Sequence, residues 1–323
     1  MHRSVVRGVG GYLPEKCITN EDLAHTVDTT DAWIVERTGM KQRHVLAEHQ
    51  NTSDMAAEAA KIALHNAGLS PSEIDLIVVA TVTPDHPFPA TAARVQAKLC
   101  ANKAFAFDVN AVCSGFIYAL SVADQYIKTG MAKRALVIGA DAMSKIIDWT
   151  DRATAVLFGD GAGALVLEGV PATHGDNDRG IQSTHLFSDG NHYDLLYVDT
   201  VSASENQAGH VRMQGREIFK FAIKLIGEAV EVVLQNNNIT VDDIDWFVPH
   251  QANLRIIEGI STHFKIPMEK MVVTVDRHSN TSAATIPLAL WEAQLDGRIQ
   301  KNHRVVLEAM GGGLTWASAL IKW

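Results

Sequence analysis

Hydrophobic and polar positions along the chain follow two spacings, one typical of helices and the other of strands. The segments with apolar residues at helical spacing are 52–67, 114–128, 216–235 and 284–296. Short apolar runs at 76–82 and 244–248 lie between these segments and predict buried strands. Alternation of this kind predicts an α/β protein whose mixed or parallel sheets are covered by helices.

The same order of elements occurs twice at a constant distance. A shift of 170 residues places 62–80 over 232–250 and, without a gap, 130–140 over 300–310. Few residues are identical, but equal spacing of like patterns predicts a duplicated chain. The predicted halves are residues 1–172 and 173–323.

Composition and charge exclude several classes of protein. The 323 residues are 47% hydrophobic and carry a net charge of −9, which speaks against binding to nucleic acid phosphates. The opening residues do not resemble a secretory signal, and no apolar run approaches the roughly 20 residues of a membrane span. Three cysteines without a CxxC pair indicate neither a disulfide framework nor a metal site. We therefore predict a cytoplasmic protein that contacts neither membrane nor nucleic acid.

Cys113 is the cysteine with a chemically suggestive position. It follows an apolar run and precedes the predicted helix 114–128. Unpaired backbone N–H groups and the positive end of the helix dipole lower the pKa of a thiol at such a place. A buried structural cysteine remains the alternative, since free cysteines are often buried. Cys17 and Cys100 lack this context, and we interpret them as structural.

His250 and Asn280 occupy corresponding places in the second half of the chain. His250 follows a predicted strand and aligns with Ala80 under the shift of 170, while Asn280 precedes the helix that matches the Cys113 helix. A pseudo-twofold arrangement of the halves would bring these three polar side chains together. For Asn280 a helix cap is the alternative interpretation.

Two glycine-rich segments have different interpretations. Residues 311–313 (GGG) follow a predicted strand, where glycine lets the backbone approach a ligand and offer N–H groups to an oxyanion. Residues 158–164 (FGDGAGA) are superficially similar to a dinucleotide loop, but the required strand, helix and acidic residue are out of order. We predict close packing at 158–164.

Six motifs together resemble one enzyme family. They are TTDAWIVERTG (29–39), CSGF (113–116), FGDGAGA (158–164), HQANLRI (250–256), NTSAA (280–284) and GGGLTW (311–316). Over nearly its whole length the chain resembles the β-ketoacyl-acyl carrier protein synthase III family. The resemblance implies a homodimer with a thiolase-like fold of five layers, αβαβα, and two mixed sheets. The duplication agrees with this fold but does not by itself establish it.

The resemblance also implies a reaction. Cys113 would take the acyl group of an acyl-CoA, with its own N–H and that of Gly312 as the oxyanion hole. His250 and Asn280 would bind the thioester of malonyl-acyl carrier protein during decarboxylation. The products would be β-ketoacyl-acyl carrier protein, CoA and CO2, formed by a ping-pong mechanism that starts type II fatty acid synthesis. No cofactor is implied, because the coenzyme A thioester is a substrate.

Further positions match the family's binding residues. Those implied for coenzyme A and its pantetheine are Thr29, Trp33, Arg37, Arg152 and Asn253. Those implied for the acyl pocket are Phe88, Met143, Leu157 and Met310, with Phe88 reaching the partner's pocket. Lys220 and Arg255 match a basic rim for the acidic carrier protein. Met310 stands where relatives commonly have Phe, and Thr262 and His263 stand where they often have Lys, so acyl preference and rim strength stay open.

Three different functions are also compatible with parts of the sequence. A papain-like cysteine hydrolase has Cys, His and Asn in this order, and here the first two are separated by 250 − 113 = 137 positions. Against it stand the duplication and the absence of a CGSCW-type segment. The remaining two are a condensing enzyme of specialised metabolism and a noncatalytic binder of carrier protein. The starter acyl chain cannot be deduced from the sequence.

Overall fold

Two mixed β-sheets form the frame of the protein. The computed structural model describes residues 2–172, 178–199 and 209–323. The first sheet has the strand order β1 (His2–Tyr12), β7 (Asp160–Pro171), β6 (Arg134–Ala142), β4 (Leu76–Ala80) and β5 (Phe105–Val109). The second has the order β11 (Trp246–Pro249), β12 (Arg304–Gly311), β13 (Thr315–Lys322) and β8 (Gly180–Ser188). In each sheet the central strands β4 and β12 have a parallel neighbour, β6 and β11 respectively.

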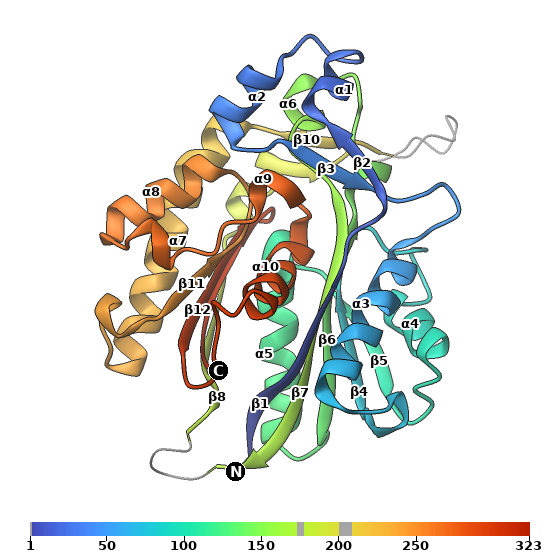
Figure 1. Cartoon of the computed structure of the whole chain (residues 1–323), viewed down its shortest axis with the longest axis vertical. Helices are drawn as coiled ribbons and strands as arrows, with labels where there is room; N and C mark the ends of the chain where they lie inside the picture. The colour runs from blue at the N-terminus through green and yellow to red at the C-terminus, as the bar shows by residue number, and fades with distance from the viewer. Residues whose placement is uncertain (1, 173–177, 200–208) are drawn as a thin grey trace.

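Helices cover both sheets and fill the space between them, which gives five layers in the order αβαβα (Figure 1). One outer layer contains α3 (Thr52–Ala67) and α4 (Thr91–Leu99). The middle layer contains α5 (Gly115–Lys128) and α10 (Thr285–Leu295). The other outer layer contains α7 (Gly215–Asn237) and α8 (Leu254–Phe264). The predicted thiolase-like fold is confirmed.

Short elements form a cap at one end of the layers (Figure 1). They are α1 (Asn20–Ala24), α2 (Asp31–Thr38), α6 (Arg152–Ala155), α9 (Val275–His278) and the strand pairs β2 (Lys16–Thr19) with β3 (Gln42–Val45) and β9 (Leu196–Val198) with β10 (Val211–Met213). Among the described residues, no helix is both long and apolar enough to cross a membrane.

The core explains the apolar runs in the sequence. All five residues of β4 are buried, because helices cover both faces of its sheet, and such strands are apolar throughout rather than alternating. Between the sheets, Leu120 and Leu290 of the middle helices pack with Val78 of the first sheet and Val248 of the second. The halves therefore share one core layer.

Local structure repeats at the shift of 170 residues. The turns Pro71–Glu73 and Val241–Asp243 correspond, as do the turns Val112–Ser114 and Ser282–Ala284. The backbone N–H of Arg134 donates to Asp75 at 2.9 Å, and that of Arg304 donates to Asp245 at 2.7 Å. The division into halves at residue 172 is a proposal that sheet membership supports, since β7 lies in the first sheet and β8 in the second.

Some predicted boundaries were wrong by a few residues. The strand predicted over 76–82 ends at Ala80, because Thr81 and Val82 turn to donate to the Asp141 carboxylate at 2.9 and 2.8 Å. The prediction of close packing at 158–164 is confirmed. A Cβ atom on Gly163 would lie 2.7 Å from the backbone of Pro287, so glycine allows α10 to contact β7.

Candidate active site

Cys113 lies in a tight turn between β5 and α5. It is buried, and the preceding residue Val112 has φ 47°, a left-handed conformation that β-branched residues rarely adopt. The equivalent residue of the other half, Ser282, has φ 51° and lies opposite Cys113. The Cys113 Sγ donates to the Ser282 Oγ at 3.7 Å. Two strained turns related by the duplication thus meet at the thiol.

Burial dominates the electrostatics of this thiol. It raises the pKa of Cys113 to about 12, assisted by the nearby Asp141 and opposed by the hydrogen bond to Ser282. The lowered pKa expected from the helix N-terminus is therefore wrong for the enclosed site. Because the thiol is protonated at neutral pH, it must lose its proton as it attacks a substrate.

His250 follows β11 and is held by one hydrogen bond from its backbone and one at its ring. Its backbone N–H donates to the Glu308 carbonyl at 2.8 Å, and its ring Nδ1 lies 2.7 Å from the hydroxyl of Thr285 at the start of α10. Burial lowers the pKa of His250 to about 3, so the ring is neutral. When Thr285 donates to Nδ1, Nε2 carries the ring proton and can donate to a substrate oxygen. The Thr285 hydroxyl also lies 3.1 Å from the Ser282 carbonyl. Because the hydroxyl has one proton, it cannot donate to both groups, and donation to Nδ1 is the arrangement that leaves Nε2 protonated.

Asn280 is buried just before the turn that contains Ser282. Its Oδ1 accepts a hydrogen bond from the Ser282 backbone at 2.9 Å, which orients the amide group. Its Nδ2 donates no hydrogen bond to a described residue and is available to a ligand. Asn280, His250 and Cys113 line one cavity of about 110 Å³, so the structure brings the three predicted residues together.

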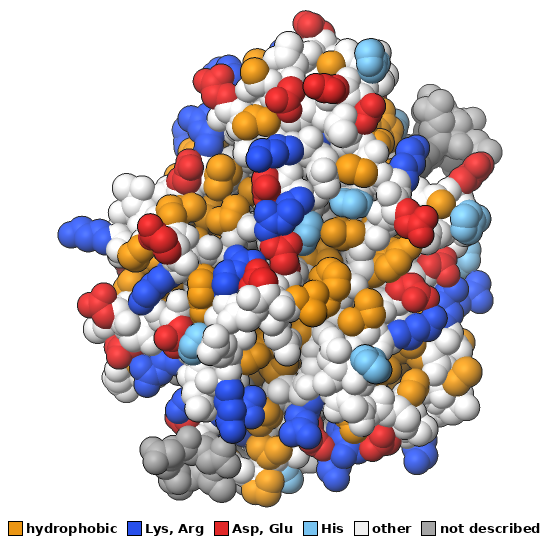
Figure 2. Space-filling model, viewed as in Figure 1, with side chains coloured by type: hydrophobic (Ala, Val, Ile, Leu, Met, Phe, Trp, Pro, Cys, Tyr) orange, Lys and Arg blue, Asp and Glu red, His pale blue; other side chains and the backbone are white. Residues whose placement is uncertain are grey.

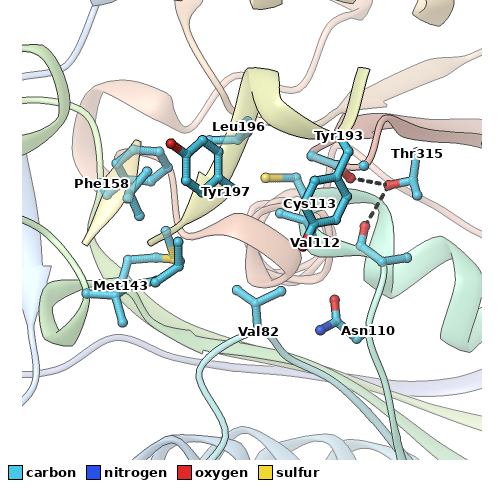
Figure 3. Close-up of a pocket in the computed structure, with 16 residues that line it drawn as sticks. Val82, Asn110, Val112, Cys113, Met143, Phe158, Tyr193, Leu196, Tyr197 and Thr315 are labelled. Atoms are coloured by element: carbon cyan, nitrogen blue, oxygen red, sulfur yellow. Dashed lines mark hydrogen bonds between the residues drawn. The ribbon is translucent and has the colours of Figure 1, made fainter. Parts of the chain in front are cut away.

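A second cavity, of about 380 Å³, opens on the other side of the thiol. Figure 3 shows Cys113 between Tyr193, Leu196 and Tyr197 on one side and Val82 and Asn110 on the other. Met143 lines this cavity, whereas Leu157 and Met310 line the smaller one with His250. The residues predicted for one acyl pocket are thus divided between two cavities. Phe88 lines neither and is 84% exposed.

Gly311 keeps the backbone N–H of Cys113 accessible. A Cβ atom at this position would lie 2.6 Å from the Cys113 nitrogen, too close for any other residue. Under the shift of 170, Gly311 corresponds to Asp141, and Cys113 corresponds to Ala283. The Asp141 carboxylate accepts a hydrogen bond from the Ala283 N–H at 3.1 Å. In the first half the equivalent N–H, that of Cys113, therefore faces a glycine instead of a carboxylate and can be offered to a substrate oxygen.

Four of the residues predicted to bind coenzyme A lie together, and one of them, Asn253, lines the smaller cavity. The guanidinium carbons of Arg37 and Arg152 lie 4.7 and 4.9 Å from the ring centre of Trp33. Asn253 lines the cavity and donates to the Arg37 carbonyl at 3.0 Å. Among the described residues, the buried hydroxyl oxygen of Thr29 has no hydrogen-bond partner. Aromatic and cationic groups therefore stand together at this site.

The predicted carrier-protein rim is only weakly basic. Lys220 forms an ion pair with Glu217 at 2.9 Å, and Arg255 lies 6.0 Å above the ring of Phe219. On the face shown in Figure 2, basic and acidic side chains are interspersed. His263 lines a shallow groove with Lys220, at a place where a lysine would have strengthened the positive charge.

The sequence analysis did not identify Ser282, Thr285 or Asp141 as site residues. The duplication contained a signal for Ser282, because the shift of 170 places the turn 282–284 over the turn that holds Cys113. Asp141 lies at the end of β6 among apolar residues, where a buried carboxylate needs several donors. Nothing in the sequence indicated which residue forms a hydrogen bond with the His250 ring.

Comparisons with known proteins agree with this geometry. Residues 107–190 match the family model described as 3-oxoacyl-[acyl-carrier-protein] synthase III, and residues 234–323 match the model of its C-terminal region. The β-ketoacyl-[acyl-carrier-protein] synthase III of Paramagnetospirillum magneticum is 57% identical over 320 residues, 99% of each chain.

Solved structures show the same similarity. The 3-oxoacyl-[acyl-carrier-protein] synthase III of Aquifex aeolicus has a TM-score of 0.93 and 44% identity, covering 99% of this chain and 100% of the other. The corresponding enzyme of Pseudomonas aeruginosa has a TM-score of 0.93 and 39% identity, covering 99% and 98%.

The five layers and the cavity with a cysteine, a histidine and an asparagine define a condensing acyltransferase with a thiolase-like fold. The identity over the full length specifies the family further. The chain belongs to the β-ketoacyl-[acyl-carrier-protein] synthase III family.

Proposed function

We propose that this enzyme condenses an acyl-CoA starter with malonyl-acyl carrier protein and thereby starts type II fatty acid synthesis. The reaction is a decarboxylating Claisen condensation that yields β-ketoacyl-acyl carrier protein, CoA and CO2. The observation that carries the proposal is the placement of Cys113, His250 and Asn280 on one cavity. The order of events is ping-pong, because one nucleophile holds the acyl group between the two substrates.

In the first half-reaction Cys113 attacks the acyl-CoA thioester. The backbone N–H groups of Cys113 and Gly312 receive the oxyanion of the tetrahedral intermediate. Two observations support this role. The Cys113 N–H is accessible beside Gly311, and the equivalent N–H of the other half, that of Ala283, donates to the Asp141 carboxylate. The acyl chain extends into the larger cavity, where Met143 adapts to its shape.

In the second half-reaction His250 and Asn280 donate hydrogen bonds to the malonyl thioester oxygen. The pKa of His250, held near 3 by burial, keeps the ring neutral, so it acts as a donor and gains no proton from the substrate. Both hydrogen bonds strengthen as negative charge develops on this oxygen, when loss of CO2 forms the enolate. The carbanion then attacks the acyl-cysteine.

The nucleotide of coenzyme A binds where Trp33, Arg37 and Arg152 meet, because an aromatic ring suits a base and guanidinium groups suit phosphates. Thr29 and Asn253 contact the pantetheine, which enters through the smaller cavity. Lys220 and Arg255 meet the acidic carrier protein, weakly because Glu217 already pairs with Lys220.

The active form is a homodimer. Strand β5 is at the edge of the first sheet, so its outer backbone groups have no strand partner among the described residues (Figure 1). An open edge strand is a template for pairing with a second copy. The exposed Phe88 then enters the larger cavity of the partner. If a fully monomeric preparation turns over at the normal rate, this part of the proposal fails.

The proposal is tested by mass spectrometry of the intact enzyme after incubation with a mixture of acyl-CoAs. We expect one acyl adduct on Cys113 that disappears when malonyl-acyl carrier protein is added and product forms. An adduct that is released to water as free acid would instead support a cysteine hydrolase. Product formation with another extender thioester, but not with malonyl-acyl carrier protein, would support a role in specialised metabolism.

A further inference from the structure

A series of hydrogen-bonding side chains begins at Cys113 and leads away from the substrate cavities. The Sγ donates to Ser282 at 3.7 Å, and the Ser282 hydroxyl lies within hydrogen-bonding reach of the Asp141 carboxylate. All three residues are buried, Ser282 and Asp141 completely. This series joins Cys113 of the first half to Ser282 of the second half and then to Asp141 of the first half.

The hydrogen bonds around Asp141 leave one oxygen for a proton. Oδ1 accepts from the hydroxyls of Thr81 and Thr83 at 2.9 and 3.0 Å. Each of these hydroxyls also accepts a backbone N–H, so its proton points to the carboxylate. Oδ2 accepts the Ala283 N–H at 3.1 Å and has fewer donors than Oδ1, and the Ser282 side chain also hydrogen-bonds to this carboxylate. A proton that arrives from Ser282 is therefore received on Oδ2.

The other candidate base near the thiol is unsuitable. His250 uses its Nδ1 on Thr285, and among the described residues no hydrogen bond joins it to Cys113. Burial lowers its pKa to about 3, so the neutral ring does not take up a second proton at neutral pH. Burial raises the pKa of the Asp141 carboxyl group, so this carboxylate takes up a proton more readily than an ordinary one.

We propose that Ser282 relays the thiol proton of Cys113 to Asp141 while the thiol attacks the acyl-CoA. The proposal rests on the function proposed above. As the bond from Sγ to the acyl carbon forms, the thiol proton moves to the Ser282 oxygen and the Ser282 hydroxyl proton moves to Oδ2 of Asp141. When the bond to the coenzyme A sulfur breaks, the same relay runs in reverse and returns one proton to that sulfur. No oxidant or further reactant is needed.

The strained backbone of Ser282 is consistent with this role. A serine at φ 51° is held there by its surroundings, including the hydrogen bond from its N–H to Asn280. This conformation presents the hydroxyl to the thiol and the N–H to the amide of Asn280. One residue thus serves both half-reactions, the first by its side chain and the second by its backbone.

The test is Ser282→Ala, with Ser114→Ala as the matched control. Ser114 adjoins Cys113, but its hydroxyl donates to the Thr315 carbonyl at 2.9 Å, outside the relay. We expect Ser282→Ala to slow single-turnover acylation of Cys113 by about 100-fold or more, the lower end of what general base catalysis contributes. Decarboxylation of malonyl-acyl carrier protein should continue at the control rate, because the backbone that orients Asn280 is unchanged. Acylation of Ser282→Ala at the rate of the control would overturn the relay.

A second measurement uses the unmodified enzyme, so it does not depend on the folding of a variant. The acylation rate in mixtures of H2O and D2O should follow a bowed curve, since two protons move in one step. A linear dependence, or no isotope effect, would overturn the relay. Failure of the underlying function looks different, because the unmodified enzyme would then form no condensation product from an acyl-CoA and malonyl-acyl carrier protein.

Discussion

The hydrogen bond between Thr285 and His250 should control decarboxylation without affecting acylation. Thr285→Val keeps the shape of the side chain and removes the hydroxyl that lies 2.7 Å from Nδ1. Without that donor, no partner fixes the ring proton on Nε2, where the malonyl thioester needs it. A buried hydrogen bond is worth about 1 to 1.5 kcal/mol, which corresponds to a rate lower by roughly 5- to 13-fold.

The assay is release of labelled CO2 from malonyl-acyl carrier protein by Thr285→Val, beside single-turnover acylation by acyl-CoA. Thr285→Ser is the control, because it keeps the hydroxyl at the same place and should decarboxylate normally. Decarboxylation by Thr285→Val at the rate of the unmodified enzyme would show that Thr285 does not set the ring proton. Equal loss in both variants would indicate a packing defect and would refute the reasoning too.

Three further substitutions test other contacts. Gly311→Ala should slow acylation by about 100- to 1,000-fold, the usual cost of one blocked oxyanion donor, since its Cβ would lie 2.6 Å from the Cys113 nitrogen. Normal single-turnover acylation would contradict this. Arg152→Ala removes a guanidinium 4.9 Å from the Trp33 ring and should raise KM for acyl-CoA but not for malonyl-acyl carrier protein, whereas equal increases would remove Arg152 from the nucleotide site. Met143→Phe narrows the larger cavity and should change the ranking of starter chains in competition assays, and an unchanged ranking would place Met143 outside the acyl path.

The layered fold was predictable because its cause is visible in the sequence. Buried strands such as β4 are apolar throughout, and helices such as α3 have one apolar face, so both patterns survive in a single sequence. Strand β1 was not predicted, because its glycines are typical of a loop. The structure uses them for contact with α3, since a Cβ on Gly10 would lie 2.2 Å from the Ala59 carbonyl oxygen. Such close approaches between distant segments leave no periodic pattern.

The site was predictable in its residues but not in its electrostatics. Cys113, His250 and Asn280 each stand at a strand end or helix start, and the duplication relates those places. The pKa of the Cys113 thiol depends instead on burial by both halves and on the charge of Asp141, which is distant in sequence. The helix dipole is a local property and was visible, whereas the burial that outweighs it was not.

The most direct test of the account is a comparison of Cys113→Ala with His250→Ala in the two half-reactions. Intact-mass detection measures the acyl-enzyme, and labelled CO2 measures decarboxylation. We predict that Cys113→Ala forms no acyl-enzyme but still decarboxylates malonyl-acyl carrier protein, and that His250→Ala forms the acyl-enzyme but loses decarboxylation by about 100- to 1,000-fold. Decarboxylation by His250→Ala at the rate of the unmodified enzyme would contradict the assignment of His250 and Asn280 to the enolate.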